Sequence, residues 1–317
     1  MLRPLKEGLS GYSRAGISLH GQHAAVARVE RQKTARPRVS ARAIQTSAQV
    51  EDWPEQAIAG IDLGRAPVSA VLTGDAYQLQ LVEKPNVPDD ELQDAVRWRL
   101  QHLIDYPVDE AVVQVFEMPP HANVASPPTA YAVVSPKTEI LDEIARMQRA
   151  ELRMDVIDIP ELCVRNVAVS LPQDNDGVAF LHFTEDCGYL TITRRGVLHL
   201  LRRIETSRDD FADHDVESFL FQEQVASISL EVQRSLDYYE SHYDSQPVSE
   251  LVIGPGHGLD ALTGAMQEQL GIGVGRLDFN DLFDMDSDIS AEEQGYCLLA
   301  IGAALRTEVP ATKATLQ

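Results

Sequence analysis

The sequence contains little cysteine and no long run of apolar residues. Its 317 residues include three cysteines, Cys163, Cys187 and Cys297, and none belongs to a Cys-x-x-Cys pair. We therefore expect buried thiols in a reducing cytoplasm instead of a disulfide framework or a zinc site. No stretch approaches the roughly 18 apolar residues of a membrane-spanning helix, and the N-terminus lacks the apolar core of a signal peptide. The sequence predicts a cytoplasmic protein without a membrane span.

Basic residues are also scarce. The chain has 27 Lys and Arg residues against 49 Asp and Glu residues, which gives a net charge of −22. A nucleic-acid-binding protein needs a basic surface, so this class is not expected. The charge is uneven, because residues 1–50 hold 9 basic and 2 acidic residues, whereas residues 205–250 hold 2 basic and 12 acidic. Two interpretations stay open: solvated faces, or a basic surface that lies near anionic lipid.

The first half of the chain predicts strands and helices in alternation. Apolar and polar residues alternate in a hairpin at 15–32, in a strand at 38–48 and in a second hairpin at 67–85. A short helix is predicted at 53–61. Between residues 88 and 153 the pattern predicts an inserted unit with its own small core, made of a helix beginning at Pro88, two strands, and a helix capped by Ser135-Pro136.

The second half repeats this layout without repeating the sequence. After a turn at 172–177, three strands precede a long helix at about 215–241. Strand, helix and strand patterns follow, and a capping box formed by Ser290 and Glu293 opens the last helix. Helical spacing predicts the buried stripe of the long helix to be Phe219, Val225, Ile228, Val232, Leu236 and Tyr239.

The order of three strands followed by alternating helices and strands, seen twice, resembles the duplicated ribonuclease-H-like lobes of the actin-like superfamily. The resemblance implies a two-lobed α/β fold. The first lobe would span residues 1–171, with a small α/β subdomain inserted at about 86–153. The second would span 172–309 and lack its usual small subdomain, because only eleven residues, 205–215, separate the last strand from the long helix. Residues 310–317 are expected to form a flexible tail.

Three segments, at 69–115, 188–205 and 232–262, resemble the PilM family of type IV pilus assembly proteins. The second of these is a strand pair, and the third carries the helix "RSLDYY" before a strand. With its short length and degenerate loops, the chain is most similar to the MshI branch, which belongs to the mannose-sensitive haemagglutinin (MSHA) pilus system. The first segment matches the family's "P-x-x-E-L" helix and the acidic turn after it at Pro88, Glu91, Leu92, Trp98, Tyr106 and Pro107.

The resemblance implies a cytoplasmic scaffold recruited to the inner membrane by a partner. That partner would be a PilN-like bitopic membrane protein, whose cytoplasmic tail would lie in a groove between the first lobe and the inserted subdomain. Other pilus platform proteins would also bind. Trp98 and Tyr106 are candidate contacts, although their spacing also suits the core. Two alternatives stay open: an actin-like ATPase with rearranged phosphate loops, and the equivalent component of a type II secretion system or competence pilus.

An actin-like ATPase holds Mg²⁺ and phosphate with two loops, each carrying an aspartate and glycines. The family's first loop reads D-x-G followed by small residues and a lysine, and its second loop repeats D-x-G. The matching positions here are Ser18, His20 and Ala25 in the first loop, and His182, Phe183 and Thr184 in the second. Neither loop keeps its carboxylate or its glycine, so we expect a pseudo-ATPase without catalytic residues, bound metal or cofactor.

The third nucleotide element, the adenosine loop, is partly kept as Gly254-Pro255-Gly256-His257-Gly258. These glycines have two explanations: residual contact with a nucleotide, or the space that a strand needs to turn into a helix. One further pattern imitates a metal site. Asp284, Asp286 and Asp288 follow the start of a calcium-binding EF-hand, but the required glycine and glutamate are missing, so solvation of a helix start is the better interpretation.

Overall fold

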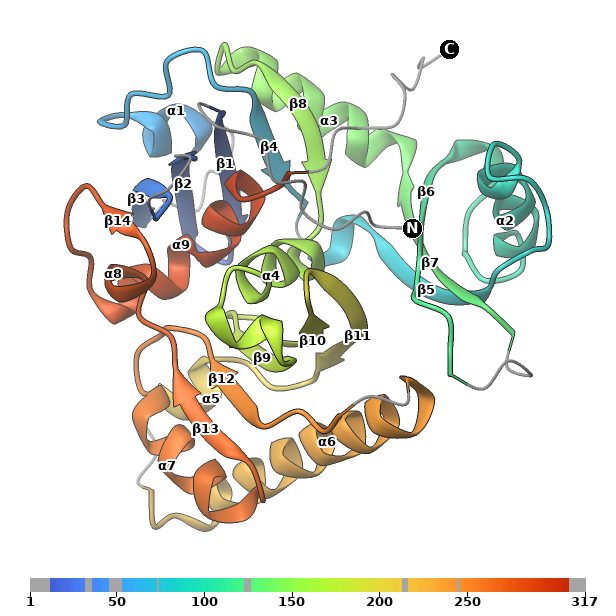
Figure 1. The fold of residues 1–317 in the computed structure, drawn as a ribbon. Helices are drawn as coiled ribbons and strands as arrows, with labels where there is room; N and C mark the ends of the chain where they lie inside the picture. Colours follow the sequence, from blue (N-terminus) through green and yellow to red (C-terminus); the bar gives the residue numbers. More distant parts are fainter. Residues whose placement is uncertain are drawn as a thin grey trace.

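The computed structural model describes residues 12–31, 36–45, 53–72, 74–122, 127–212, 216–243 and 246–307. Its largest sheet belongs to the first lobe (Figure 1). The strand next to β1 on one side is antiparallel to it, whereas β4 and β8 on the other side run parallel to it. The strand order is β14 (Asp284–Met285), β3 (Arg38–Gln45), β2 (His23–Glu30), β1 (Ser13–His20), β4 (Val68–Val71) and β8 (Met154–Asp158).

The second lobe repeats this topology. Its first three strands form an antiparallel meander, and the last two run parallel to the first strand of the meander. The order is β11 (Val197–Ile204), β10 (Gly188–Arg194), β9 (Val178–Phe183), β12 (Glu250–Ile253) and β13 (Gly273–Arg276). The predicted internal duplication is therefore confirmed.

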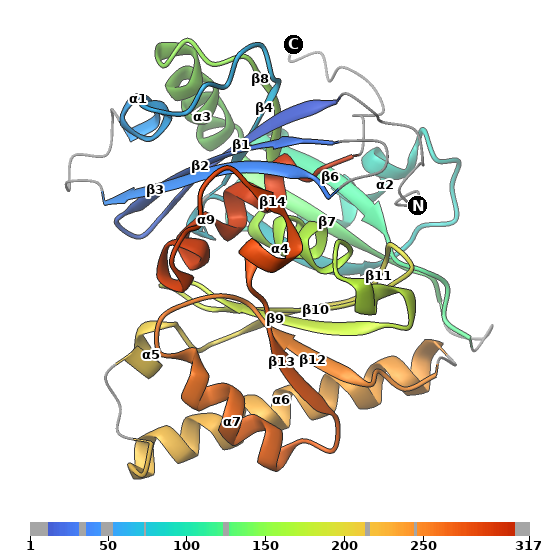
Figure 2. The ribbon, with the colours of Figure 1, turned by 60° about the vertical axis from the view of Figure 1, so that its left-hand side comes forward.

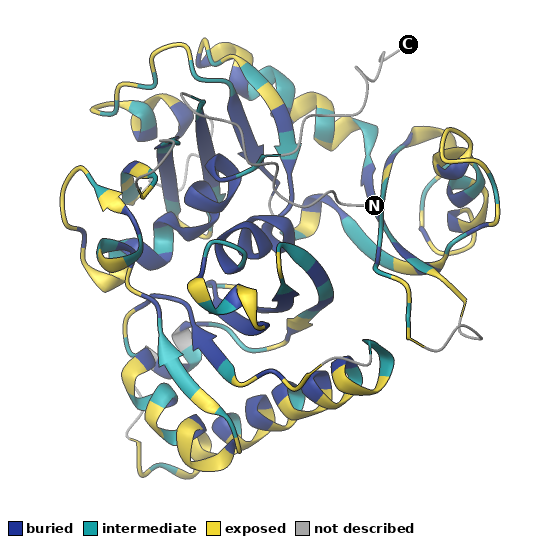
Figure 3. Cartoon of the chain, viewed as in Figure 1, coloured by how far each residue is buried: buried dark blue, intermediate teal, exposed yellow. Residues whose placement is uncertain are grey.

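Two helices, α4 (Pro160–Ala168) and α9 (Ala291–Ala304), lie between the two sheets (Figure 2). Helix α9 packs on β1 and β2, and α4 packs on β9 and β10. The helices also contact each other, and Figure 3 shows that both are almost entirely buried. Their apolar side chains, including Cys163 and Cys297, form the core between the lobes. All three cysteines are free and buried, as the sequence predicts.

Other helices cover the outer faces of the two sheets. On the first lobe these are α1 (Trp53–Ile58) and α3 (Lys137–Arg149), whose buried Trp53 and Met147 join one cluster. On the second they are α6 (Phe219–Tyr243) and α7 (Leu259–Gln269), below the sheet in Figure 2. The short α5 (Asp209–Ala212) precedes α6, and α8 (Phe279–Leu282) precedes β14. No described helix is long and apolar enough to cross a membrane.

The inserted subdomain has its own sheet, in the order β5 (Gln78–Glu83), β7 (Thr129–Pro136), β6 (Ala111–Glu117), with α2 (Leu92–Leu100) against one face. The predicted hairpin at 67–85 is therefore wrong. Its first half, β4, pairs with β1 and β8, whereas β5 pairs with β7. The chain passes between the two sheets through a 3₁₀ turn at Gly74–Ala76, so the insertion begins at β5, before residue 86.

Two local predictions also need correction. Phe219 was placed in the buried stripe of α6, but its side chain is 78% exposed, and Phe221 is buried in its place. Ser135 does not cap α3, because its hydroxyl donates to the carbonyl of Ala76 instead. Half of the predicted capping box is present: the Ser290 side chain accepts from the backbone of Glu293, whereas the Glu293 carboxylate accepts from the Ala43 N–H. The predicted tail at 310–317 lies outside the described residues.

Candidate functional site

The first two predicted phosphate loops face each other between the lobes. Ser18 on β1 and Ala25 on β2 form a buried cross-strand pair, two residues before the turn that carries His20. On the other side, the turn from β9 to β10 follows His182 and Thr184. The structure therefore brings together the two loops that the sequence paired, although neither holds a family carboxylate at the expected position.

A carboxylate missed by the sequence analysis fills the space between the two turns. The Glu185 side chain accepts a hydrogen bond from the Gln22 backbone N–H at 3.2 Å and shares another with His23 Nδ1 at 2.6 Å. Arg208 Nη2 donates to the same carboxylate at 3.3 Å. Gly21 has φ +54°, and a Cβ there would overlap the Glu185 carboxylate. Glu185 thus joins the turn between β1 and β2 to the segment that carries Arg208.

With the neighbouring contacts, four segments of the chain meet around Glu185. His20 pairs with Asp186 at 3.0 Å, and this hydrogen bond lowers the pKa of the Asp186 carboxyl. The His23 ring stacks on Tyr296 of α9 at 3.6 Å, and the Arg208 guanidinium lies 4.4 Å from the centre of that tyrosine ring. We call Glu185, Asp186, His20, His23, Arg208 and Tyr296 the interlobe cluster.

The adenosine-loop glycines have local structural reasons. A Cβ on Gly254 would lie 2.8 Å from Nδ1 of His182, Gly258 has φ +75°, and a Cβ on Gly256 would lie 2.9 Å from the movable end of the Leu259 side chain. His182 is itself fully buried, and neither ring nitrogen has a hydrogen-bond partner among the described residues. Thr184 is also used structurally, since its hydroxyl donates to the carbonyl of Cys187. The glycines are therefore explained by the turn without a nucleotide.

We expect His182 to make the protein sensitive to acid. Burial is the main cause that lowers the pKa of His182 to about 3. The unfolded chain takes up this proton below about pH 6.5, whereas the folded protein does not until about pH 3, so stability falls as the pH falls through this window. The loss relative to pH 7 reaches about 3 kcal/mol at pH 4.5. Urea unfolding of wild type and His182→Leu at the two pH values measures it.

The matched control is Thr191→Val, which also replaces a buried polar group without a hydrogen-bond partner by an apolar one but removes no titrating group. Its effect on stability should be equal at both pH values. The free energy of unfolding of His182→Leu, measured relative to that of wild type, should be about 3 kcal/mol higher at pH 4.5 than at pH 7. If the stability difference between His182→Leu and wild type were the same at both pH values, His182 would not be a buried imidazole that stays neutral in the folded protein.

A second polar network fixes the inserted subdomain to both lobes. Tyr77, which precedes β5, donates to the buried Glu161 carboxylate of α4 at 2.5 Å, and Arg203 of β11 contacts both side chains. Burial raises the pKa of the Glu161 carboxyl. Tyr131 of β7 donates to the Leu201 carbonyl at 3.0 Å. The position of the subdomain against the lobes is therefore set by buried contacts.

The two predicted partner contacts lie on one side of this subdomain. Trp98 is 69% exposed on α2, which covers the sheet face directed away from the lobes (Figure 1). Tyr106 is half-buried beside the same small core. The other face carries an apolar row that the sequence analysis missed, in which Leu81, Tyr131 and Phe116 are cross-strand neighbours and Leu81 is 53% exposed.

Several basic residues of the first 50 are bound within the protein. Arg28 pairs with Glu30, Arg38 pairs with Asp286, and Arg42 donates to the Ala59 carbonyl. For these arginines the structure favours internal pairing over a surface for anionic lipid. Asp286, part of the sequence that imitates an EF-hand, is used in this pairing. No group of three or more metal-ligating side chains occurs among the described residues.

Comparison with known proteins finds the fold but no sequence family. No protein-family model matches the chain, and no curated protein matches it. A chain of the PilM-PilN type IV pilus biogenesis complex superposes with a TM-score of 0.71 at 16% identity, covering 92% of this chain and 97% of that one.

Two further structures superpose less closely. A Bacteroides thetaiotaomicron protein with an actin-like ATPase fold gives a TM-score of 0.47 at 11% identity, covering 94% of this chain and 97% of that one. The cytoplasmic domain of EpsL, an inner-membrane component of the Vibrio cholerae type II secretion system, gives 0.48 at 10%, covering 94% and 97%. With its duplicated lobes and its likeness to the PilM-PilN chain, this protein has the predicted two-lobed actin-like fold with an inserted subdomain.

Proposed function

We propose that this protein is a non-catalytic scaffold of a type IV pilus assembly machine that binds the cytoplasmic tail of a PilN-like inner-membrane protein. The observation that carries the proposal is the likeness to the PilM-PilN chain, which extends over 92% of the present chain and so includes the inserted subdomain. By this proposal the protein works in the cytoplasm and reaches the inner membrane through its partner. The finer assignment, to the MshI branch and the MSHA pilus, rests on the sequence resemblance.

The interlobe cluster supports the non-catalytic part of the proposal. The Glu185 carboxylate lies between the two turns and is bonded to the Gln22 N–H and to His23, so a phosphate group could enter there only by displacing it. Arg208 is bonded to the same carboxylate. ATP with Mg²⁺ at millimolar concentration should therefore leave the melting temperature unchanged. A rise of several degrees would favour the rival, an actin-like ATPase with rearranged loops.

We propose the apolar row of Leu81, Tyr131 and Phe116 as the surface that receives the partner's tail. The row lies on the sheet face opposite α2, and the same face packs on the second lobe through Leu198 and Leu201. The row therefore borders the contact between the subdomain and the second lobe, and an extended peptide can add apolar contacts along it. Leu81 is the member of the row with the most exposed surface left to cover.

Substitution of Leu81 by aspartate should weaken binding of the partner's tail about 30-fold, which corresponds to about 2 kcal/mol, because it places a charge in the apolar contact. The measurement is calorimetric titration with the N-terminal tail peptide of the PilN-like protein from the same organism. Trp98→Ala is the comparison variant, since Trp98 is also an exposed apolar residue but lies on the other side of the subdomain.

Three outcomes separate the possibilities. Loss of binding in Leu81→Asp with retention in Trp98→Ala supports the apolar row. The reverse pattern places the tail on α2, at the candidate contact Trp98. No binding to the wild-type protein, together with unchanged membrane recruitment when the tail is deleted, rejects the scaffold proposal. Co-purification with the membrane proteins encoded beside it would then distinguish an MSHA pilus from a type II secretion system.

A further inference from the structure

Two surface pockets on the first lobe differ in how their charged side chains are used. The larger, about 650 Å³, is lined by Arg28, Arg38 and Arg42 among others, and all three are bound to acceptors of the protein itself. The smaller, about 280 Å³, is lined by Arg65, Arg153 and Glu151 around apolar side chains. Within the described part of the chain, none of these three side chains has a hydrogen bond or ion pair. Its charges are thus available to a ligand.

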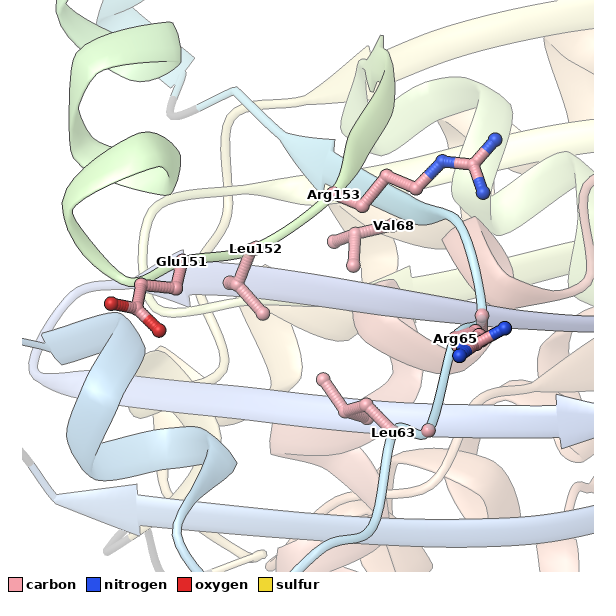
Figure 4. Close-up of a pocket in the computed structure, with 8 residues that line it drawn as sticks. Leu63, Arg65, Val68, Glu151, Leu152 and Arg153 are labelled. Carbon is pink, nitrogen blue, oxygen red and sulfur yellow. The ribbon is translucent and has the colours of Figure 1, made fainter.

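The smaller pocket lies between the segment that enters β4 and the turn from α3 to β8 (Figure 4). Leu63, Val68 and Leu152 form its apolar floor. The guanidinium groups of Arg65 and Arg153 lie on one side of that floor, and the Glu151 carboxylate lies at the opposite end. Glu151 adopts φ +55°, the left-handed conformation in which helices commonly end, directly after α3.

The pocket is separate from the interlobe cluster. Strands β1, β4 and β8 run parallel, and β1 ends at His20 in the cluster. The pocket lies where β4 and β8 begin, which is the opposite end of the same sheet. It is also outside the apolar row on the inserted subdomain. A ligand bound here would therefore leave both of those surfaces free.

We propose that this pocket binds an acidic peptide segment of a partner protein, with one aliphatic side chain on the floor and a carboxylate held by Arg65 and Arg153. A cavity of about 280 Å³ is at the lower limit for small-molecule sites and suits a single side chain. Two unpaired guanidinium groups beside an apolar floor match a carboxylate next to an aliphatic group. Glu151 at the opposite end disfavours a second negative charge there, which sets the direction of the segment.

The carboxylate can come from a chain terminus or from an acidic side chain, and three short acetylated peptides distinguish the two sources. The probes are Gly-Ser-Leu with a free C-terminal carboxylate, the same peptide amidated, and Gly-Leu-Glu-Gly amidated. Binding is followed through the NMR signals of the arginine side chains in the full-length protein. We expect at least one acidic probe to bind and the neutral amide to bind at least tenfold more weakly.

Substitution of either Arg65 or Arg153 by alanine should weaken binding of the acidic probe about tenfold. Arg149→Ala removes the same charge from an exposed position on α3 and should change nothing. Binding of Gly-Ser-Leu acid alone identifies a chain terminus, and binding of the glutamate probe alone identifies an internal segment. Three results would overturn the proposal. The neutral amide binds as tightly as the acidic probes, or Arg149→Ala weakens binding as much as Arg153→Ala. The third is that neither acidic probe binds at 5 mM, which corresponds to about 3 kcal/mol of binding free energy. None of these results bears on binding of the tail at the apolar row.

Discussion

Replacement of Gly302 by valine is expected to cost about 4 kcal/mol or more of folding free energy, enough to leave most of the protein insoluble. Gly302 lies in α9 where this helix crosses α4. A Cβ at this position would overlap the carbonyl oxygen of Cys163 and lie 2.7 Å from its carbonyl carbon. The obstacle is backbone, and every residue of α4 is buried, so the helix has nowhere to move.

The matched control is Gly264→Ala in α7, where no atom lies within 4 Å of the new Cβ. That substitution should stabilise the protein by about 0.5–1 kcal/mol, because alanine favours a helix over glycine. Soluble yield and urea unfolding report both variants. If the Gly302→Val protein were as soluble and stable as wild type, α4 and α9 would not cross this closely. The packing of the core between the lobes described above would then be wrong.

The duplicated lobes were predictable because each begins with a local pattern, a meander of three alternating strands, followed by regular changes between helix and strand. Strand pairing is not local, which explains the false hairpin at 67–85. Both of its strands exist, but β4 pairs with β1, about 50 residues before it, and with β8, which follows the insertion. A polar turn between two strands therefore does not decide whether they share a sheet.

The candidate site was predictable in its location and not in its contents. Matching the sequence to the family's phosphate loops placed His20 and His182 at the two facing turns, as the structure does. Glu185 lies one residue beyond Thr184 and so outside the family's D-x-G positions, which are the only ones the motif predicts. Its partners Gln22 and Arg208 come from two other segments. The available signal was an acidic pair, Glu185-Asp186, in a tight turn opposite two histidines.

Reversal of the charge at Glu185, by Glu185→Lys, should destabilise the protein by about 4 kcal/mol, because it removes the carboxylate that accepts from Arg208 and the Gln22 N–H and adds a positive charge beside them. The Glu185 side chain is only 18% exposed, so solvent replaces little of what is lost. Glu185→Gln should cost about 2 kcal/mol, since the shape is kept and the charge is removed. Asp186→Asn is the control on the same turn, and its 63% exposed side chain should give a loss below about 1 kcal/mol.

The same variants test whether Glu185 stands in the place of phosphate. In Glu185→Gln the neutral amide competes less well than the carboxylate for Arg208 and the Gln22 N–H, so millimolar pyrophosphate can displace it and should raise the melting temperature of this variant but not of wild type or Asp186→Asn. A destabilised Glu185→Gln protein that ignores pyrophosphate would leave Glu185 as a link between the lobes and remove its comparison with phosphate. Equal stability of all three proteins would remove the link as well. The expected pair of results would mean that a side chain of this protein holds the two lobes together at the position where an actin-like ATPase uses a nucleotide.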